Sequence, residues 1–316
     1  MSLASTATFW RPTLSVRLPR ALKVAAVITA GFLAAMLSDL AFAAERPQPA
    51  SFAAAASRPA CGGEVACTVP LGAYRIALPP DGRVEGAYVF FHGYRSSAAE
   101  QMGATDLVAV AHAHHLAFVA PDGLNGTWSH DNAVRHDRDE TAFARQVFDD
   151  LTGRWHVPAD RLIVGGFSQG ASTAWHVVCH AGDRVAAAVT FSGVFWNPLP
   201  APADCATTPP PMIHFHGTAD QTFPLAGRAI GDRWHQGDMY LSLDIVRARA
   251  ACPVAPRVRR IVAGIDCIET DGCDRGPILA CVHDAGHEVR AGWLAGALDT
   301  LLAPPVPWRV SAPAAP

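Results

Sequence analysis

Lysine is almost absent from this chain. Lys23 is the only lysine among 316 residues, and arginine supplies the other basic side chains. We attribute this bias, together with the abundance of alanine, to genomic codon usage rather than to function. The chain also has no basic patch and no long run of one charge, and its net charge is −3. These absences argue against a nucleic-acid-binding protein, so no nucleic acid is expected among its partners.

An apolar run long enough for a stable membrane span is also absent. Val24–Leu37 is short, rich in alanine and closely followed by Asp39. It has the organisation of a leader, because Ala41-Phe42-Ala43 offers a small-x-small cleavage site and four basic residues precede the run. We therefore expect residues 1–43 to be a signal peptide, with an uncleaved anchor as the alternative. The mature protein would be secreted or periplasmic, without stable membrane association.

Without the leader, 21 basic and 27 acidic residues remain. They belong to a chain of about 270 residues, close to the upper limit for a single hydrophobic core. Residues 44–60 are mostly alanine, proline and serine, so we interpret residues 44–68 as a linker that ends in a small disulfide loop. One folded domain is expected over residues 69–303, followed by a proline-rich tail at residues 304–316.

Cys-x-x-Cys pairs, the usual signature of a cysteine-bound zinc ion, are a third absence. All eight cysteines follow the leader, and an even number in an exported chain predicts disulfides. The last four cysteines allow three connectivities, of which one is preferred. The expected pairs are Cys61–Cys67, Cys179–Cys205, Cys252–Cys273 and Cys267–Cys281. No metal ion and no other cofactor is expected.

Strand-like and helix-like patterns alternate along the rest of the chain. Strands are expected at residues 74–78, 87–92, 116–120, 161–165, 185–191, 211–215, 257–262 and 278–282. Helices are expected at residues 96–112, 139–155, 171–180, 240–251 and 288–302. This alternation predicts an α/β fold with a mostly parallel central sheet and helices on both of its faces.

One motif carries the most functional information. Gly166-Phe167-Ser168-Gln169-Gly170 directly follows an expected strand and precedes an expected helix, which is the context of a nucleophile elbow. The serine must occupy a tight strand-to-helix turn, so glycine at 166 and 170 avoids collisions with the adjoining strand and helix. The helix that begins there also directs backbone N–H groups toward a developing oxyanion. A plain glycine-rich turn is the alternative.

A serine hydroxyl is a weak nucleophile and needs a base that a carboxylate orients. On this architecture the acid and then the histidine follow the serine along the chain, each on a loop after a strand. Asp220 follows the expected strand 211–215 and fits the acid. His287 lies at the apex of the loop after residues 278–282 and fits the base. We favour it over His283, which should still belong to the strand.

Two further loops are expected at the same edge of the sheet. Tyr94 follows an apolar strand, so the amides of Tyr94 and Gln169 are predicted to form the oxyanion hole. The loop 121–128 is expected to bind substrate, because Asn125 offers an amide and Trp128 a broad face for a sugar or aryl ring. Packing of Trp128 as core beneath the loop is the alternative.

The remaining histidines have structural interpretations. His112, His114 and His115 resemble a metal cluster, but no carboxylate is spaced near them, so a solvated helix terminus is the preferred interpretation. His214 and His216 flank the end of a buried strand and are interpreted as hydrogen-bonded polar groups.

Taken together, these residues resemble the exported esterases grouped with polyhydroxybutyrate depolymerases and feruloyl esterases. The loop Pro-Asp-Gly-Leu-Asn-Gly-x-Trp is the most family-specific of the shared segments. These segments are Phe91–Tyr94, Pro121–Trp128, Asp160–Gly170, His216–Asp220 and Ala285–His287. The resemblance implies an α/β-hydrolase fold with Ser168 as nucleophile, Asp220 as acid and His287 as base. The chain departs from the family at Gln169, where asparagine is usual, and just after His287, where an aromatic residue and proline are common.

The expected function is that of a secreted serine carboxylesterase working through an acyl-enzyme. Its partner would be an ester substrate, either soluble or polymeric. Feruloyl or acetyl esters of polysaccharide are the leading substrates, and hydroxybutyrate oligomers are the alternative. A catalytically silent polysaccharide-binding homologue is the non-enzyme alternative, and the intact serine, aspartate and histidine argue against it.

Overall fold

The computed structural model describes residues 61–254 and 257–303. The expected signal peptide, residues 44–60 of the linker and the tail 304–316 lie outside the described residues. In the described part, no helix has both the length and the apolar character needed to cross a bilayer.

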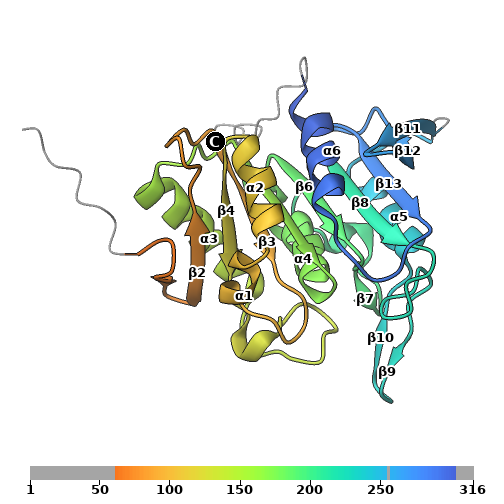
Figure 1. Ribbon diagram of the computed structural model, residues 1–316. Coiled ribbons are helices and arrows are strands. Elements are labelled where there is room, and N and C mark those ends of the chain that lie inside the picture. Colours follow the sequence, from red (N-terminus) through yellow and green to blue (C-terminus); the bar gives the residue numbers. More distant parts are fainter. Residues whose placement is uncertain (1–60, 255–256, 304–316) are drawn as a thin grey trace, which may run out of the picture. The chain divides into compact units, whose positions relative to one another are not determined.

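A sheet of ten strands forms the centre of the described chain (Figure 1). Its order is β1-β2-β4-β3-β5-β6-β8-β13-β12-β11, parallel from β4 to β13 and antiparallel at both sides. The strands are β1 Cys67–Val69, β2 Gly72–Ala77, β3 Gly86–Phe91, β4 Leu116–Pro121, β5 Leu162–Phe167, β6 Ala187–Phe191, β8 Met212–Gly217, β11 Val258–Val262, β12 Ile265–Thr270 and β13 Ile278–His283.

Helices cover both faces of this sheet, as two separate apolar clusters show. Helices α3, α4 and α5 contribute to one cluster, and α1, α2 and α6 contribute to the other. The helices are α1 Ala98–Met102, α2 Thr105–Ala113, α3 Glu140–Trp155, α4 Gln169–Ala181, α5 Met239–Arg249 and α6 Ala291–Leu302. Three short 3₁₀ turns connect elements: η1 Leu124–Gly126, η2 Gly182–Arg184 and η3 Pro202–Asp204. The predicted fold class, mostly parallel with helices on both faces, is confirmed.

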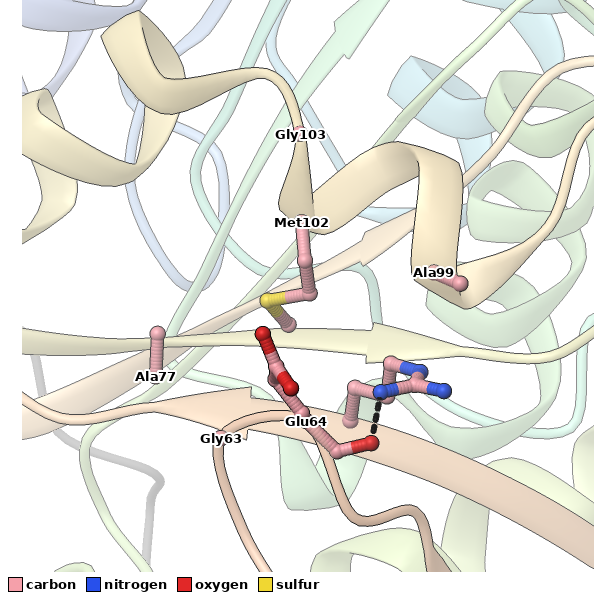
Figure 2. Close-up of a pocket in the computed structure, with 7 residues that line it drawn as sticks. Gly63, Glu64, Ala77, Ala99, Met102 and Gly103 are labelled. Atoms are coloured by element: carbon pink, nitrogen blue, oxygen red, sulfur yellow. Dashed lines mark hydrogen bonds between the residues drawn. The ribbon is translucent and has the colours of Figure 1, made fainter.

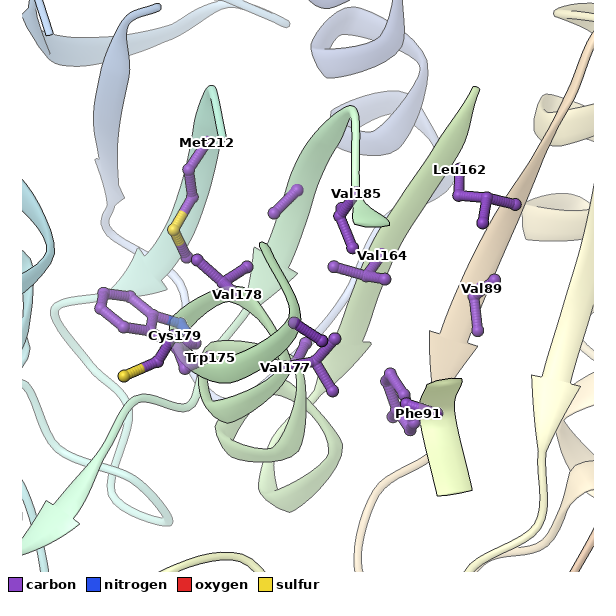
Figure 3. Packing of buried hydrophobic residues seen from close by; sticks show 14 of the residues in the cluster. Val89, Phe91, Leu162, Val164, Trp175, Val177, Val178, Cys179, Val185 and Met212 are labelled. Atoms are coloured by element: carbon purple, nitrogen blue, oxygen red, sulfur yellow. The ribbon is translucent and has the colours of Figure 1, made fainter. Parts of the chain in front are cut away.

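Helix α4 lies closest to the centre of the sheet and is almost wholly buried. Figure 3 shows its apolar residues, among them Trp175, Val177 and Val178, in one cluster with side chains of β5 and β3 such as Val164 and Val89. Because the central strands are covered on both sides, β3 and β4 are continuous apolar runs rather than alternating ones. The helix after the nucleophile motif is therefore anchored in the core.

Several elements differ from the expectation. The expected helix 96–112 is two helices, because the chain turns at Gly103 and Ala104 between α1 and α2. Strands β1 and β12 were not predicted, nor was a small antiparallel sheet of β7 Trp196–Asn197, β10 Trp234–Gln236 and β9 Ala229–Ile230. Strands of two or three residues are too short to show a periodicity. Strand β12 carries charged residues that pair with arginines of β11, which hides its strand pattern.

The cysteines pair as expected. The disulfides are Cys61–Cys67, Cys179–Cys205, Cys252–Cys273 and Cys267–Cys281, and no cysteine is free. The second disulfide ties the end of α4 to the loop before β8, and the fourth joins β12 to β13. With all eight thiols consumed, the alternative of a cysteine-bound zinc ion is wrong.

Candidate active site

Ser168 lies between the end of β5 and the start of α4, in a conformation that non-glycine residues rarely adopt. Its backbone angles are φ 57° and ψ −125°, which costs about 1–3 kcal/mol unless the surroundings hold it. Two hydrogen bonds hold it here: Ser168 N–H donates to Phe191 O at 3.0 Å, and Ser172 N–H donates to Ser168 O at 3.1 Å. The expected sharp strand-to-helix turn is present.

The two motif glycines are required by the close approach of neighbouring backbone. A Cβ atom at Gly170 would lie 2.1 Å from Phe91 O, and one at Gly166 would lie 2.5 Å from the carbonyl carbon of Gly170. Both distances are far below van der Waals contact, so any side chain at either position would displace the elbow from β3. This confirms the steric reason given for the Gly-x-Ser-x-Gly pattern.

Asp220 and His287 meet at the same edge of the sheet. Asp220 follows β8 and His287 follows β13, and His287 Nδ1 donates to Asp220 Oδ2 at 2.7 Å. Their loops are joined by backbone bonds, since Thr218 N–H donates to His283 O and Ala219 N–H donates to Ala285 O. The ring of His287 packs against Phe167, the residue before Ser168, with ring centroids 4.6 Å apart. The three predicted residues therefore converge at the carboxyl ends of β5, β8 and β13.

The carboxylate of Asp220 is buried and fully hydrogen-bonded. Oδ1 accepts from the N–H groups of Thr222 at 2.9 Å and Phe223 at 2.8 Å, and Oδ2 accepts from His287. Burial raises the pKa of Asp220, but the hydrogen bonds from His287 and Phe223 outweigh it, so the pKa lies below its ordinary value. Asp220 thus carries a negative charge at neutral pH and holds His287 with its proton on Nδ1.

His214 and His216 form a buried chain of hydrogen bonds beneath this pair. Thr190 Oγ1 donates to His214 Nδ1 at 2.8 Å, and His214 Nε2 donates to His216 Nδ1 at 3.0 Å. His216 Nε2 then donates to Phe223 O at 2.6 Å. Because the N–H of Phe223 holds Asp220, this chain supports the loop that carries the acid. The interpretation of both histidines as bonded polar groups agrees with these contacts.

His283 occupies a different environment from His287. It is the last residue of β13, as expected, and its ring stacks on Trp293 with centroids 4.1 Å apart. Its Nδ1 accepts from Ala285 N–H at 3.2 Å, and it makes no contact with Asp220 comparable to that of His287. The geometry therefore favours His287 as the partner of the acid.

The two predicted oxyanion donors belong to segments that border Ser168. Gln169 is the first residue of α4, so its backbone N–H has no acceptor within the helix. Tyr94 follows Gly93, and a Cβ atom at Gly93 would lie 3.7 Å from Ser168 Cβ. The Tyr94 side chain is 60% exposed, so this part of the turn faces solvent. Both segments border the serine, and the oxyanion hole formed by the two amides stays a prediction.

The side chain of Gln169 has a role that the sequence did not reveal. It is buried, and its Oε1 accepts from Thr127 Oγ1 at 2.9 Å while its Nε2 donates to Trp128 O at 3.3 Å. Gln169 therefore fastens the loop 121–128 to the first turn of α4. In the sequence, the only indication that Gln169 has a special role was that the resembled family usually has asparagine at this position.

The two residues expected to bind substrate, Asn125 and Trp128, lie in different environments. Asn125 is exposed at the loop tip, in a left-handed conformation with φ 55°. Trp128 is 0% exposed, donates from Nε1 to His92 O at 2.8 Å and contacts Phe91 edge-on. Its indole offers no face to a ligand. The substrate-binding expectation for Trp128 is therefore corrected, and the alternative, packing as core beneath the loop, describes its contacts.

Two surface pockets lie apart from these residues. One of about 560 Å³ is bordered by Met102 of α1 and by Glu64 and Arg75, where Arg75 donates to the Glu64 carbonyl (Figure 2). A second of about 320 Å³ lies between the loop around Asn132 and strand β10 at Trp234. Neither is lined by Ser168, Asp220 or His287.

Comparisons with known proteins identify the family of this chain. The sequence profile of the phospholipase/carboxylesterase family matches residues 75–236, about half of the chain. NocK of Nocardia uniformis subsp. tsuyamanensis, a protein named as an esterase, is 31% identical over 47% of this chain and 43% of its own length. Feruloyl esterase D of Neurospora crassa is 24% identical over 54% of this chain and 53% of its own. The chain thus spans about half the length of these two relatives.

A solved structure supports the fold. Acetyl xylan esterase from Aspergillus awamori matches with a TM-score of 0.54 and 15% sequence identity, over 69% of this chain and 89% of that one. At this identity the likeness concerns the fold alone, which is that of an α/β hydrolase.

Proposed function

We propose that this chain, which belongs to the phospholipase/carboxylesterase family, is a secreted serine esterase that cleaves carboxylic esters through an acyl-enzyme. The observation that carries the proposal is the 2.7 Å bond from His287 Nδ1 to the buried, ionised Asp220, formed beside a serine on a strained elbow. A plain glycine-rich turn would need neither this pair nor the strained serine.

In the first half of the reaction, Ser168 is the nucleophile and His287 the base. With the Nδ1 proton held by Asp220, Nε2 of His287 carries a free lone pair that accepts the proton of the Ser168 hydroxyl. The serine oxygen attacks the ester carbonyl carbon, and the carbonyl oxygen becomes an oxyanion that accepts from the amides of Tyr94 and Gln169. The alcohol then leaves with the proton from His287, and an acyl-Ser168 ester remains.

The second half repeats the chemistry with water. His287 Nε2 takes a proton from a water molecule, whose oxygen attacks the acyl carbonyl. Collapse of the second oxyanion breaks the bond to Ser168 Oγ, which recovers its proton from His287. The products are one alcohol and one carboxylic acid, and the enzyme returns to its starting state without a cofactor.

For the substrate, we propose feruloyl or acetyl esters of polysaccharide. Support comes from the relative that is named a feruloyl esterase and from the exposed loop around Asn125, which borders the elbow through its bonds to Gln169. Since Trp128 is buried, the loop would contact a sugar through its polar tip rather than through an aromatic platform.

Export is part of the proposal. Four disulfides use all eight cysteines, and such bonds persist in oxidising compartments. Together with the leader-like sequence of residues 1–43, they support a secreted or periplasmic enzyme.

The decisive experiment is labelling with a fluorophosphonate probe followed by hydrolysis of p-nitrophenyl acetate. We expect the wild type to be labelled, and Ser168→Ala to lose both labelling and roughly 10⁴–10⁶-fold in turnover. Ser192→Ala is the matched control, because Ser192 is also a positive-φ serine that follows a central strand; it should keep both properties. A Ser168→Ala enzyme with a tenth of wild-type turnover would refute the assignment.

The substrate class needs a separate panel of methyl ferulate, acetylated xylan and hydroxybutyrate oligomers. Methyl ferulate or acetylated xylan should have the highest kcat/KM. A clear preference for the oligomers would contradict the polysaccharide-ester assignment while leaving the serine mechanism intact.

A further inference from the structure

A group of polar side chains on the far part of α4 has no part in the reaction proposed above. His176 and His180 lie one turn apart on α4, and Asp131 reaches them from the loop that follows Trp128. Asp131 Oδ2 is 3.7 Å from His176 Nδ1 and 3.9 Å from His180 Nε2. These are too long for hydrogen bonds, so the three groups face one another without being joined.

Two buried imidazoles, His176 of this group and the neighbouring His130, have nitrogens without partners. In the described part of the chain, Nε2 of His176 and Nε2 of His130 lack any hydrogen bond. Both rings are at least nine-tenths buried, and they stack nearly parallel with centroids 5.1 Å apart. An unsatisfied buried polar atom costs about 1–3 kcal/mol, so this part of α4 is rich in polar groups whose bonding is incomplete. The His176 nitrogen that faces Asp131 is Nδ1, not the unpartnered Nε2.

We infer that Asp131, His176 and His180 form a binding site for a divalent transition-metal ion, with zinc as the best match. Two imidazole nitrogens and a carboxylate oxygen are ligands that zinc prefers, and three protein ligands leave one position for water. Tetrahedral zinc with bonds of about 2.0–2.1 Å would place neighbouring ligand atoms about 3.3 Å apart. Asp131 Oδ2 is already 3.7 and 3.9 Å from the two imidazoles, and all three ligand atoms lie within 4.8 Å of one another, so the side chains must close by up to about 1.5 Å.

The site is open to solvent on one side. The side chain of Asp131 is 71% exposed and that of His180 is 27% exposed, whereas that of His176 is 7% exposed. A metal ion can therefore bind from solution without unfolding the core. Once bound, the ion would connect the loop after Trp128 to helix α4. It would thereby supplement the two hydrogen bonds by which the Gln169 side chain already connects the loop 121–128 to this helix.

The inference is tested on the full, disulfide-bonded protein after dialysis against a chelator. Isothermal titration with Zn²⁺ should give one ion bound per chain, and added Zn²⁺ should raise the melting temperature because it binds only the folded site. Co²⁺ should bind with the visible absorption of a tetrahedral nitrogen and oxygen site. Asp131→Asn and His180→Gln, both at accessible positions, should each weaken binding by more than about tenfold.

His114→Gln is the matched control, because His114 also faces an aspartate, Asp299, but belongs to no such cluster. It should bind Zn²⁺ as the wild type does. Circular dichroism checks that each variant is folded. A wild type that binds no Zn²⁺ would overturn the inference, as would Asp131→Asn and His180→Gln proteins that bind it with unchanged affinity.

Discussion

At the scale of single residues, the same side chain acquires different chemistry from its surroundings. His283 and His287 are four positions apart, yet one stacks on Trp293 and the other donates to Asp220. The aspartate is ionised because the hydrogen bonds from His287 and Phe223 outweigh the effect of burial on its pKa. The role that we propose for His287 therefore depends on the loop geometry that places it against a buried carboxylate, not on its identity as a histidine.

This contrast gives a prediction for the two histidines. His287→Ala should lower kcat by about 10³–10⁴-fold or more, because the serine then has no base and the triad acts as a unit. His283→Ala should retain most of the activity and lose thermal stability, since its ring packs against α6. Steady-state kinetics on p-nitrophenyl acetate and a melting curve for each variant provide the measurements. If His283→Ala were the inactive one, our assignment of the base would be wrong.

At the scale of elements, the loop 121–128 is fixed by contacts with the protein core, and its tryptophan does not present an aromatic surface to a substrate. Trp128 fills the space under it, and His92 supports it from β3 because Gly123 N–H donates to His92 Nε2 at 3.0 Å. Gln169 adds two bonds from α4. The loop therefore links the end of β3, which precedes Tyr94, to the start of α4.

Removing the indole tests this view. Trp128→Ala should destabilise the protein by about 3–5 kcal/mol, the usual cost of deleting a large buried aromatic side chain. Its kcat/KM should fall to a similar extent for p-nitrophenyl acetate and for methyl ferulate, because the defect lies in the support of the elbow. Trp234→Ala is the control, since Trp234 is only partly buried, and it should change the melting temperature less. A Trp128→Ala protein of normal stability with a selective loss on methyl ferulate would restore the substrate-binding interpretation.

At the scale of the whole molecule, buried imidazoles make stability depend on pH. Burial holds the pKa of His92, His214 and His216 below the ordinary value in the folded protein. The unfolded chain binds a proton on each ring as the pH falls through about 6.5, whereas the folded protein binds it only at lower pH. The unfolded state then holds more protons, so the free energy of unfolding decreases as the pH falls.

We expect this loss to reach up to about 1.4 kcal/mol per pH unit for each of the three histidines below pH 6.5. The depressed pKa of Asp220 acts in the same direction, but at more acidic pH. Urea unfolding at pH 7.5, 6.5 and 5.5 should show falling midpoints. His156→Asn is the control, because His156 is exposed, and it should leave the pH dependence unchanged. Equal midpoints for the wild type at pH 7.5 and 5.5 would contradict the prediction.

The sequence by itself determined the fold class, the elbow and the order of the three proposed triad residues. These follow from local rules: the alternation of strands and helices, the glycines that a tight turn demands, and loops that must end at one edge of a parallel sheet. The preferred disulfide pairs agree with the structure, although the sequence left three connectivities open for the last four cysteines.

Tertiary structure alone decided which polar and aromatic side chains face solvent, ligand or core. Burial of Trp128, the bonds of Gln169 to the loop 121–128 and the approach of Asp131 to α4 all join residues far apart in the sequence. Such contacts leave no periodic pattern in the sequence, because each depends on how two elements pack against each other. The short and charged strands were missed for the same reason, since pairing with a neighbour, rather than their own composition, makes them strands.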